Sequence, residues 1–282
     1  MHWQTARFSI DLGRPQVMGI LNVTPDSFSD GGRPGGVAGA LAHAERLLSE
    51  GADILDVGGE STRPGSLMPS VEEELSRVLP VVRELVRLEV PVSVDTSRPE
   101  VIRAVLGLGA DIVNDIRALN WPGALEATAA HPRAGVVLMH MQGQPQTMQD
   151  APAYDGPVLA EVLGFLQARV QVAQQAGIAR GRIVLDPGYG FGKTHAHNLA
   201  LWQGQEVLLQ TLGLPLLAGW SRKGTLGQLT GRPVGERMVA SVAAALASVQ
   251  RGARIVRVHD VAATVDALKV WAAAGLVPGQ PA

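Results

Sequence analysis

Polar side chains recur at the ends of short apolar runs in this sequence. The runs VPVSV, ADIV and RIVL lead into Asp95, Asn114 and Asp186, and LPLLAGW is followed by Ser221-Arg222-Lys223. Two carboxylates, an amide and an ammonium gathered in one pocket would suit a flat heterocycle that has both donor and acceptor edges. A carboxylate can accept two N–H bonds from such a ring and so fix its plane. A structural alternative is a buried Asp95–Lys223 ion pair that only stabilises the core.

A second group of side chains is suited to binding an anion. Arg257 and His259 flank Val258 in the run ARIVRVHD, and alternation along a strand places both on the same side. We expect them to form an anion clamp, with Arg63 as a further positive contact from a loop. The structural alternatives are a histidine beside a helix start and a solvated loop arginine.

The segment 188–194, GYGFGKT, resembles a phosphate-binding loop but fails its pattern. Pro187 stands where that motif requires a glycine five residues before Gly192. We interpret the glycines as allowing the backbone to approach a ligand closely, with Phe191 as a wall of the pocket. Lys193 follows Gly192 in this segment and is one of only three lysines, with Lys223 and Lys269.

The sequence gives weaker evidence for a metal site or a catalytic nucleophile than for the two binding groups above. The histidines His140, His195, His197 and His259 do not have the spacing of a transition-metal site. Asn22 offers a hard oxygen at a strand end and would suit Mg²⁺ if a diphosphate supplied further ligands. Neither Ser61 nor Ser221 lies in a G-x-S-x-G frame, so we predict no serine nucleophile.

The elements that must position these residues alternate between apolar strands and amphipathic helices. Strands are predicted at 17–23, 53–57, 91–95, 111–114, 135–139, 183–186, 215–219 and 254–258. About eight strand–helix units, with polar residues after nearly every strand, favour a (β/α)8 TIM barrel with its active site at the carboxyl ends of the strands. A doubly wound open sheet is the alternative, but no G-x-G-x-x-G follows the first strand.

Helix boundaries are marked by local signals. Ser70 and Glu73 form a predicted capping box, and Pro99 stands near the first position of the next helix. Further helices are predicted at 157–176, 236–250 and about 261–274. Asp260 is the expected N-cap of the last of these.

Composition limits the class of protein. The 282 residues fit one barrel domain, 1–282, with 1–16 as a lead-in segment and 31–36 as a loop of the same domain. A net charge of −2 gives no reason to expect nucleic acid or an anionic membrane as partner. There is no cysteine, no secretory signal and no run near the roughly 20 apolar residues of a membrane span. We therefore expect a cytoplasmic protein.

Taken together, these segments resemble the dihydropteroate synthase family. The similarity runs in family order from about residue 17 to 262, and its longest motifs are MGILNVTPDSFSD at 18–30, DVGGESTRPG at 56–65 and LDPGYGFGK at 185–193. Shorter matches are VDT at 94–96, NDI at 114–116, LMHMQG at 138–143, SRK at 221–223 and RVHDV at 257–261.

The resemblance implies a transferase of folate biosynthesis on a TIM barrel. Such enzymes condense 6-hydroxymethyl-7,8-dihydropterin diphosphate with 4-aminobenzoate, giving 7,8-dihydropteroate and diphosphate. Arg63, Lys223, Arg257 and His259 would be catalytic. The implied pterin-binding residues are Asp95, Asn114, Asp186, Lys223, Met139 and Phe191. The implied diphosphate-binding residues are Asn22, Arg257 and His259, and Asn22 would also contact Mg²⁺. The implied aminobenzoate-binding residues are Thr62, Arg63, Pro64 and Ser221.

The resemblance also implies a homodimer that is a target of sulfonamides, which mimic the aminobenzoate. The chain departs from the family's pattern at Ser97-Arg98, where an aromatic residue and lysine are common, and at Tyr189, where phenylalanine is common. Three other readings stay open. They are a methyltetrahydrofolate-dependent methyltransferase, an aldolase with a Schiff base on Lys223, and a pterin-binding paralogue without turnover.

Overall fold

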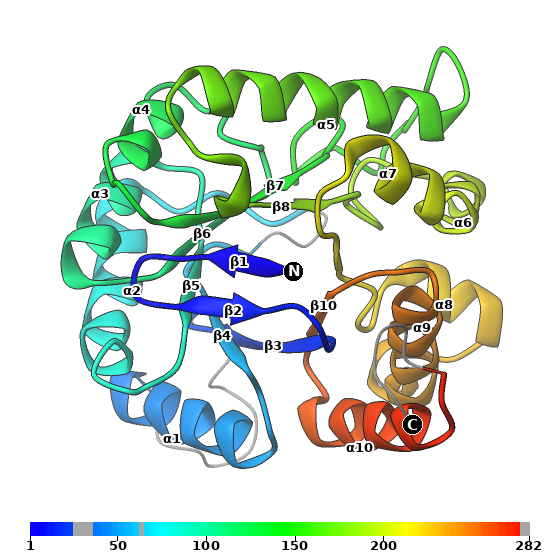
Figure 1. Cartoon of the computed structure of the whole chain (residues 1–282), viewed down its shortest axis with the longest axis horizontal. Coiled ribbons are helices and arrows are strands. Elements are labelled where there is room, and N and C mark those ends of the chain that lie inside the picture. Colours follow the sequence, from blue (N-terminus) through cyan, green and yellow to red (C-terminus); the bar gives the residue numbers. More distant parts are fainter. Residues whose placement is uncertain (25–35, 62–64, 277–282) are drawn as a thin grey trace.

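The computed structural model describes residues 1–24, 36–61 and 65–276. Eight parallel strands form one sheet in the order β8-β7-β6-β5-β4-β3-β10-β9. A parallel bridge between Leu185 of β8 and Leu216, just before β9, joins the two ends of the sheet. The sheet thus closes into a barrel ringed by helices (Figure 1), which confirms the predicted (β/α)8 fold.

All eight predicted strands are present within one or two residues of the expected ends. Their bounds are β3 Gln16–Asn22, β4 Ile54–Gly58, β5 Val92–Asp95, β6 Ile112–Asp115, β7 Gly135–Met139, β8 Ile183–Asp186, β9 Leu217–Ala218 and β10 Ile255–Val258. The largest departure is β9, which is shorter than the predicted 215–219.

Helices fill the intervals between strands, and two intervals hold two helices each. Their bounds are α1 Gly36–Ser49, α2 Val71–Leu85, α3 Pro99–Leu108, α4 Ala124–Ala129, α5 Val158–Gln175, α6 His195–Gln203, α7 Gln205–Leu212, α8 Gly224–Thr230, α9 Met238–Gln250 and α10 Val261–Ala273. The described part of the chain contains no helix that is both long and apolar enough to cross a membrane.

The predicted helix signals are largely confirmed. Ser70 and Glu73 form both bonds of the capping box at the start of α2, and Pro99 opens α3. The prediction for Asp260 was wrong in one respect. Asp260 stands at the N-cap position of α10, but its side chain does not cap the helix. Its carboxylate is paired instead with Arg222, at 2.6 Å.

The interior of the barrel changes from apolar to polar along the strands. Side chains two residues apart point the same way, so on four of the strands an inward apolar residue has an inward polar one beyond it. The pairs are Ile54 and Asp56, Ile112 and Asn114, Val184 and Asp186, and Ile255 and Arg257. The first member of each pair packs in one apolar cluster. The amino end of the barrel is therefore filled by a core, and the carboxyl end is left for chemistry.

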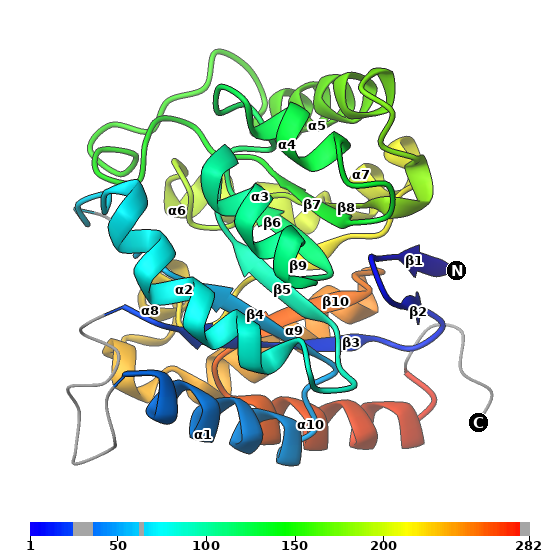
Figure 2. The same ribbon diagram turned by 90° about the vertical axis from the view of Figure 1, so that its left-hand side faces the viewer.

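A short hairpin covers the amino end of the barrel and was not predicted as strands. It consists of β1, His2–Gln4, and β2, Ser9–Asp11, paired antiparallel. Trp3 is fully buried in the cluster that fills the barrel floor, and its indole N–H donates to the carbonyl of Arg182 at 2.8 Å. In Figure 2 the hairpin lies at the opposite end of the barrel from the loops that follow the strands.

Candidate active site

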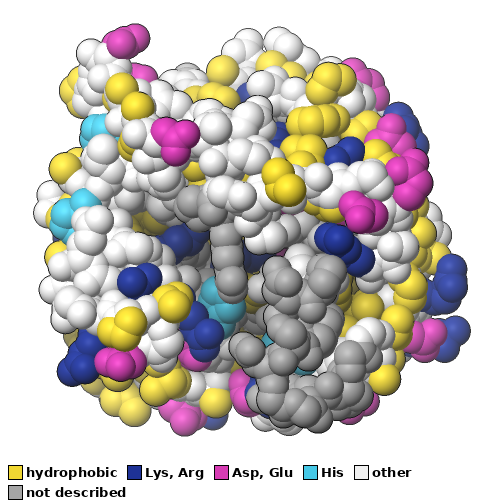
Figure 3. All heavy atoms as spheres, turned by 180° about the vertical axis from the view of Figure 1, so that it is seen from behind, with side chains coloured by type: hydrophobic (Ala, Val, Ile, Leu, Met, Phe, Trp, Pro, Cys, Tyr) yellow, Lys and Arg dark blue, Asp and Glu magenta, His cyan; other side chains and the backbone are white. Residues whose placement is uncertain are grey.

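The predicted site residues that the structure describes lie at the carboxyl end of the barrel. Figure 3 views this face, where basic and histidine side chains gather around a hollow. Thr62, Arg63 and Pro64 lie outside the described residues, so their predicted roles stay predictions.

Arg257 connects the polar side chains of three neighbouring strands. Its Nε lies 2.6 Å from Asp56 Oδ2 and its Nη2 lies 3.0 Å from Asp95 Oδ2. Asn114 Nδ2 donates to the same Asp56 oxygen at 3.2 Å. The ion pair of Asp95 is therefore with Arg257 rather than with Lys223. Nη1 of Arg257 takes no part in either ion pair.

Asp186 and Lys223 face this group from the other side of the barrel. Asp186 follows β8 and accepts the N–H of Gly188 at 2.7 Å. Lys223 precedes α8, and its Nζ lies 3.9 Å from the centre of the Phe191 ring, a cation–π geometry. The structure thus brings Asp95, Asn114, Asp186 and Lys223 to one end of the barrel.

Burial shifts the pKa values of these groups in the direction that favours their uncharged forms. It raises the pKa of Asp186 to about 6, against the opposing effects of the Gly188 N–H and Lys223. Burial also raises the pKa of Asp95 to about 8, against the opposing charge of Arg257 and with a further rise from the nearby Asp56. For Lys223, burial lowers the ammonium pKa to about 8. Near neutral pH the pocket therefore offers an acceptor at Asp186, and Asp95 is held by its contact with Arg257.

An apolar wall stands beside the polar group. Met139 and Phe191 are buried and pack in one cluster with Ile116 and Met148. A flat ring placed against this wall would have its edge towards the carboxylates. This combination of apolar walls and few polar contacts is typical of small-molecule sites.

Ser221 and His259 form a pair at the same rim. Ser221 Oγ accepts the His259 backbone N–H at 3.1 Å and lies 2.9 Å from His259 Nδ1. Burial lowers the pKa of His259 to about 3, helped by Arg222 and Arg257, so the ring is neutral at pH 7. If Nδ1 accepts the Ser221 hydroxyl, the ring proton sits on Nε2, which becomes the free donor.

Asn22 provides the oxygen that would face a divalent cation. It ends β3 opposite Gly58, and a Cβ built on Gly58 would come within 3.5 Å of Asn22 Oδ1 and 3.8 Å of Asp95 Cβ. The described residues contain no group of three or more His, Asp or Glu side chains arranged to hold a metal. One hard oxygen fits Mg²⁺ that takes its other ligands from a diphosphate and water.

Two of the three residues that depart from the family's pattern, Ser97 and Arg98, join a buried charge network beside the site. Ser97 Oγ donates to Asp115 and accepts from Arg117 Nη1 at 3.0 Å. Arg98 Nε lies 3.3 Å from a carboxylate oxygen of Glu74. Ser97 and Arg98 are therefore integrated into the packing and do not touch the predicted pterin residues.

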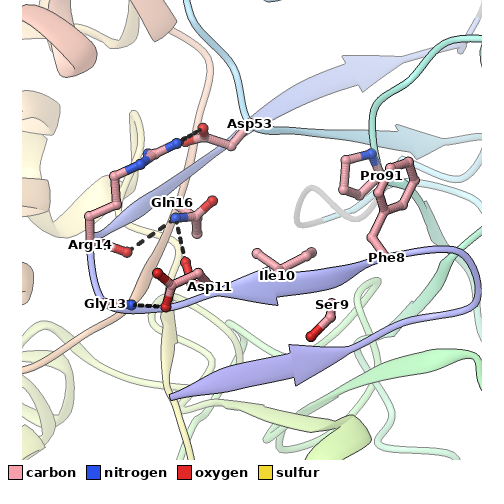
Figure 4. A pocket seen from close by; sticks show the side chains of 9 residues that line it. All are labelled: Phe8, Ser9, Ile10, Asp11, Gly13, Arg14, Gln16, Asp53 and Pro91. Atoms are coloured by element: carbon pink, nitrogen blue, oxygen red, sulfur yellow. Dashed lines mark hydrogen bonds and ion pairs between the residues drawn. The ribbon is translucent and has the colours of Figure 1, made fainter.

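Two pockets lie outside this constellation. One of about 500 Å³ is at the amino end of the barrel (Figure 4), where Arg14 and Asp53 pair at 2.5 Å. The other, of about 320 Å³, is lined by residues that include Arg117, Trp121 and Phe165. Neither includes Asp95, Asp186 or Lys223.

The sequence interpretation missed two residues that organise the site. Asp56 lies inside β4 rather than after it, so a search for polar residues past strand ends did not find it. Its signal was a carboxylate within the otherwise apolar run ILDVG. Lys193 was noted only as the end of a failed phosphate-loop motif, although it is 2% exposed.

Comparisons with known proteins agree with this geometry. Residues 18–259 match the family described as "Pterin binding enzyme". The dihydropteroate synthase of Neisseria meningitidis serogroup B is 55% identical over 279 residues, covering 97% of this chain and 98% of the relative.

Solved structures of the same enzyme superpose closely. A Yersinia pestis dihydropteroate synthase with a sulfonamide drug has a TM-score of 0.92 and 49% identity, covering 98% of this chain and 99% of its own. The Burkholderia cenocepacia enzyme complexed with 7,8-dihydropteroate has a TM-score of 0.87 and 48% identity, and the match covers 97% of this chain and 96% of that enzyme. Identity of this extent over nearly the whole length shows that the chain belongs to the dihydropteroate synthase family of pterin-binding enzymes.

Proposed function

We infer that this protein condenses 6-hydroxymethyl-7,8-dihydropterin diphosphate with 4-aminobenzoate, forming 7,8-dihydropteroate and releasing diphosphate. Family membership supports the reaction, and the product bound to the Burkholderia relative is the one it would form. The observation that carries the assignment is the gathering of Asp95, Asn114, Asp186 and Lys223 at the carboxyl end of the barrel.

The pterin ring would lie between the apolar wall and the polar group. Ionised Asp186 accepts N–H donors of the 2-amino-pyrimidinone edge, and Asn114 and Asp95 offer further donors and acceptors. Met139 and Phe191 cover one face of the ring. Lys223 donates to a ring acceptor while its charge is balanced by Asp186.

The diphosphate would lie beside His259 and Arg257, with Asn22 nearby. Neutral His259 donates from Nε2, held in this tautomer by Ser221. Arg257 Nη1 is the guanidinium nitrogen that remains outside the two carboxylate pairs. When Mg²⁺ is bound, it neutralises part of the charge on the leaving diphosphate, and Asn22 is the side chain that would hold it.

The aminobenzoate would approach from the rim formed by Ser221 and the segment that contains Thr62, Arg63 and Pro64. The drug bound to the Yersinia relative is a sulfonamide, and sulfonamides resemble aminobenzoate. We therefore propose that sulfonamides compete with aminobenzoate on this protein. A competition assay at fixed pterin diphosphate would test this.

The chemistry needs charge stabilisation more than a base. The C–O bond to diphosphate breaks, and the lone pair of the already neutral arylamine then forms the new C–N bond at the methylene carbon. The electron pair of that C–O bond leaves with the diphosphate, and the amine then loses a proton to solvent. His259 and Arg257 stabilise the departing charge. The pterin can delocalise positive charge at the methylene, so we propose that diphosphate leaves first; release that required bound aminobenzoate would contradict this order.

The rival activities give different results. A methyltransferase would transfer a methyl group from methyltetrahydrofolate and release no diphosphate. An aldolase would be trapped covalently on Lys223 by borohydride with a carbonyl substrate. A non-catalytic paralogue would bind the pterin diphosphate without turning it over.

One assay tests the proposed function directly. Pure protein is incubated with the pterin diphosphate and 4-aminobenzoate, with and without Mg²⁺, and dihydropteroate and diphosphate are both measured. We expect equal amounts of the two products and faster formation with Mg²⁺. Binding of the pterin without either product would contradict the assignment.

We also propose that the protein is a homodimer and that its location is the cytoplasm. Five large apolar side chains exposed on adjacent elements of the barrel's outer wall suggest a face for a second copy: Leu229, Val234, Met238, Val239 and Val270. Val239 is 74% exposed, so Val239→Arg should not disturb folding but should shift the mass in light scattering from dimer to monomer. A monomeric wild type would contradict the dimer, and cell fractionation tests the location.

A further inference from the structure

Lys193 is a buried lysine whose three ammonium protons all have acceptors. Its Nζ lies 2.9 Å from His140 Nδ1, 2.9 Å from the Gly188 carbonyl and 3.0 Å from the Phe191 carbonyl. Two of these acceptors belong to the loop between β8 and α6, and the third follows β7. Lys193 therefore joins the carboxyl ends of two neighbouring strands.

The contacts of Lys193 and the neutral ring of His140 support donation from the ammonium, whose charge is disfavoured by burial. Burial lowers the pKa of His140 to about 3, so its ring is neutral and Nδ1 can accept. Burial also lowers the pKa of Lys193 to about 7, which shows how costly a buried ammonium is here. Such a group is retained without severe penalty only when each proton is bonded, as it is in this loop.

The loop that Lys193 holds is packed against Lys223 with little free space. Gly190 has φ of 81°, and a Cβ on it would lie 3.0 Å from Lys223 Cδ. A Cβ on Gly188 would lie 1.8 Å from the His140 carbonyl oxygen. The loop thus passes close to both neighbours at positions that have no room for a side chain without a shift, and the Lys193 bonds tie it to the end of β7.

Phe191 is the side chain through which this loop reaches the pocket. Its carbonyl accepts from Lys193, and its ring lies beneath the Lys223 ammonium at 3.9 Å. A shift of the loop would therefore move the ring and change the surroundings of Lys223 together. Lys193 itself does not touch Lys223, Asp186 or Asp95 by any hydrogen bond or ion pair found in the described residues.

We propose that Lys193 is a positioning residue of the pterin site, which acts by fixing the Phe191 ring against Lys223. The proposal rests on the proposed function, since it assigns Phe191 to the pterin pocket. It predicts that loss of Lys193 weakens pterin binding while leaving the aminobenzoate site intact.

The first test compares Lys193→Met and Lys193→Arg with the wild type. The probe is 6-hydroxymethylpterin without diphosphate, and its Kd is measured by calorimetry. We expect Lys193→Met to raise this Kd by about tenfold or more, because two backbone carbonyls lose charged donors and the loop shifts. The KM for aminobenzoate should change by less than about twofold, and Lys193→Arg should recover part of the pterin affinity.

A matched control separates positioning from general stability. Arg182 is also a buried cation that donates to three carbonyls, of Ala134, Pro132 and His131, but at the amino end of the barrel. Arg182→Met should lower the unfolding temperature without changing the pterin Kd. If Arg182→Met and Lys193→Met weaken pterin binding equally, Lys193 has only a structural role.

A double-mutant cycle tests whether Lys193 acts through Phe191. Phe191→Leu removes the ring, so adding Lys193→Met to it should cost little further pterin affinity. Fully additive losses would overturn the proposal. If Lys193→Met does not fold, His140→Leu removes one of the three acceptors and should show a smaller loss in the same direction; an unchanged Kd there would also overturn it.

The result is distinguishable from failure of the proposed function. Product formation by the wild type establishes the activity independently. With an active wild type, the proposal for Lys193 fails if its variants keep the pterin affinity, if their losses add fully to that of Phe191→Leu, or if Arg182→Met weakens pterin binding equally.

Discussion

At the scale of residues, burial decides what each polar side chain of the site can do. Asp56, Asp95 and Arg257 form one network in which a single guanidinium serves two carboxylates. The pKa values of several groups in this pocket therefore lie close to neutral pH, as they often do at functional sites. A ligand that supplies donors and acceptors together would complete the hydrogen bonds of this network.

Asp186 gives a prediction for the pH dependence of pterin binding. Its pKa is raised to about 6 by burial, so the carboxylate that accepts ring N–H groups is lost as pH falls through that value. Pterin affinity should therefore decrease as the pH drops below about 7, and fall by up to about tenfold per pH unit below 6. Calorimetric Kd values from pH 5 to 8 check this.

The matched variant for the titration is Asp186→Asn. The amide does not ionise, so the acid limb assigned to Asp186 should disappear while overall affinity is weaker. An acid limb that persists unchanged in Asp186→Asn would assign the titration to another group.

Sequence patterns identified most of the residues that the structure brings to the carboxyl end of the barrel, but not their partners. Asp95, Asn114 and Asp186 stand at strand ends, where a barrel needs its polar residues, the glycine-rich segment indicated Phe191, and a family resemblance supplied Met139. Asp56 was missed because it lies inside β4 and not at the end of that strand. Its shared contact with Asp95 through Arg257 depends on how β4 and β5 are paired, which the sequence does not show. The partners of Lys193 could not be predicted because two come from turns of its own loop and one from another strand.

At the scale of elements, helix starts were predictable because their signals are local. The capping box of α2 satisfies two backbone donors within four residues. The failure at Asp260 has a tertiary cause, since Arg222 from another loop takes the carboxylate that a cap would need. The hairpin of β1 and β2 was missed because its three-residue strands are too short to show alternation.

The capping box gives a prediction for stability. Ser70→Ala removes the acceptor of the Glu73 N–H and should lower the free energy of unfolding by about 1 kcal/mol. Urea unfolding measures this loss. Ser76→Ala is the control, because its hydroxyl only bonds a carbonyl within the helix and its removal should cost less. Equal losses would show that the box contributes nothing specific.

At the scale of the whole molecule, the barrel separates stability from chemistry. Its amino end is a packed core sealed by the hairpin, and its carboxyl end carries the charged groups. This division was predictable in outline from the repeated strand–helix pattern. The hairpin seal depends on Trp3 reaching strands more than a hundred residues away, which no local pattern shows.

Trp3 provides the prediction at this scale. Trp3→Ala leaves a cavity in the barrel floor and should lower the free energy of unfolding by about 3–5 kcal/mol. Its pterin Kd at 25 °C should stay within about twofold of the wild type, because the site is at the other end. Trp271→Ala, on the partly exposed α10, should cost much less stability. A large change in pterin Kd for Trp3→Ala would contradict the separation of the two ends.

The central claim is that Asp186 and Lys223 together bind the pterin ring in one pocket, and pterin affinity of Asp186→Ala and Lys223→Ala measures it most directly. Each change leaves a buried partner unpaired, so each should weaken binding of 6-hydroxymethylpterin by about 2–5 kcal/mol while the protein stays folded. Wild-type affinity in both folded variants would contradict the account.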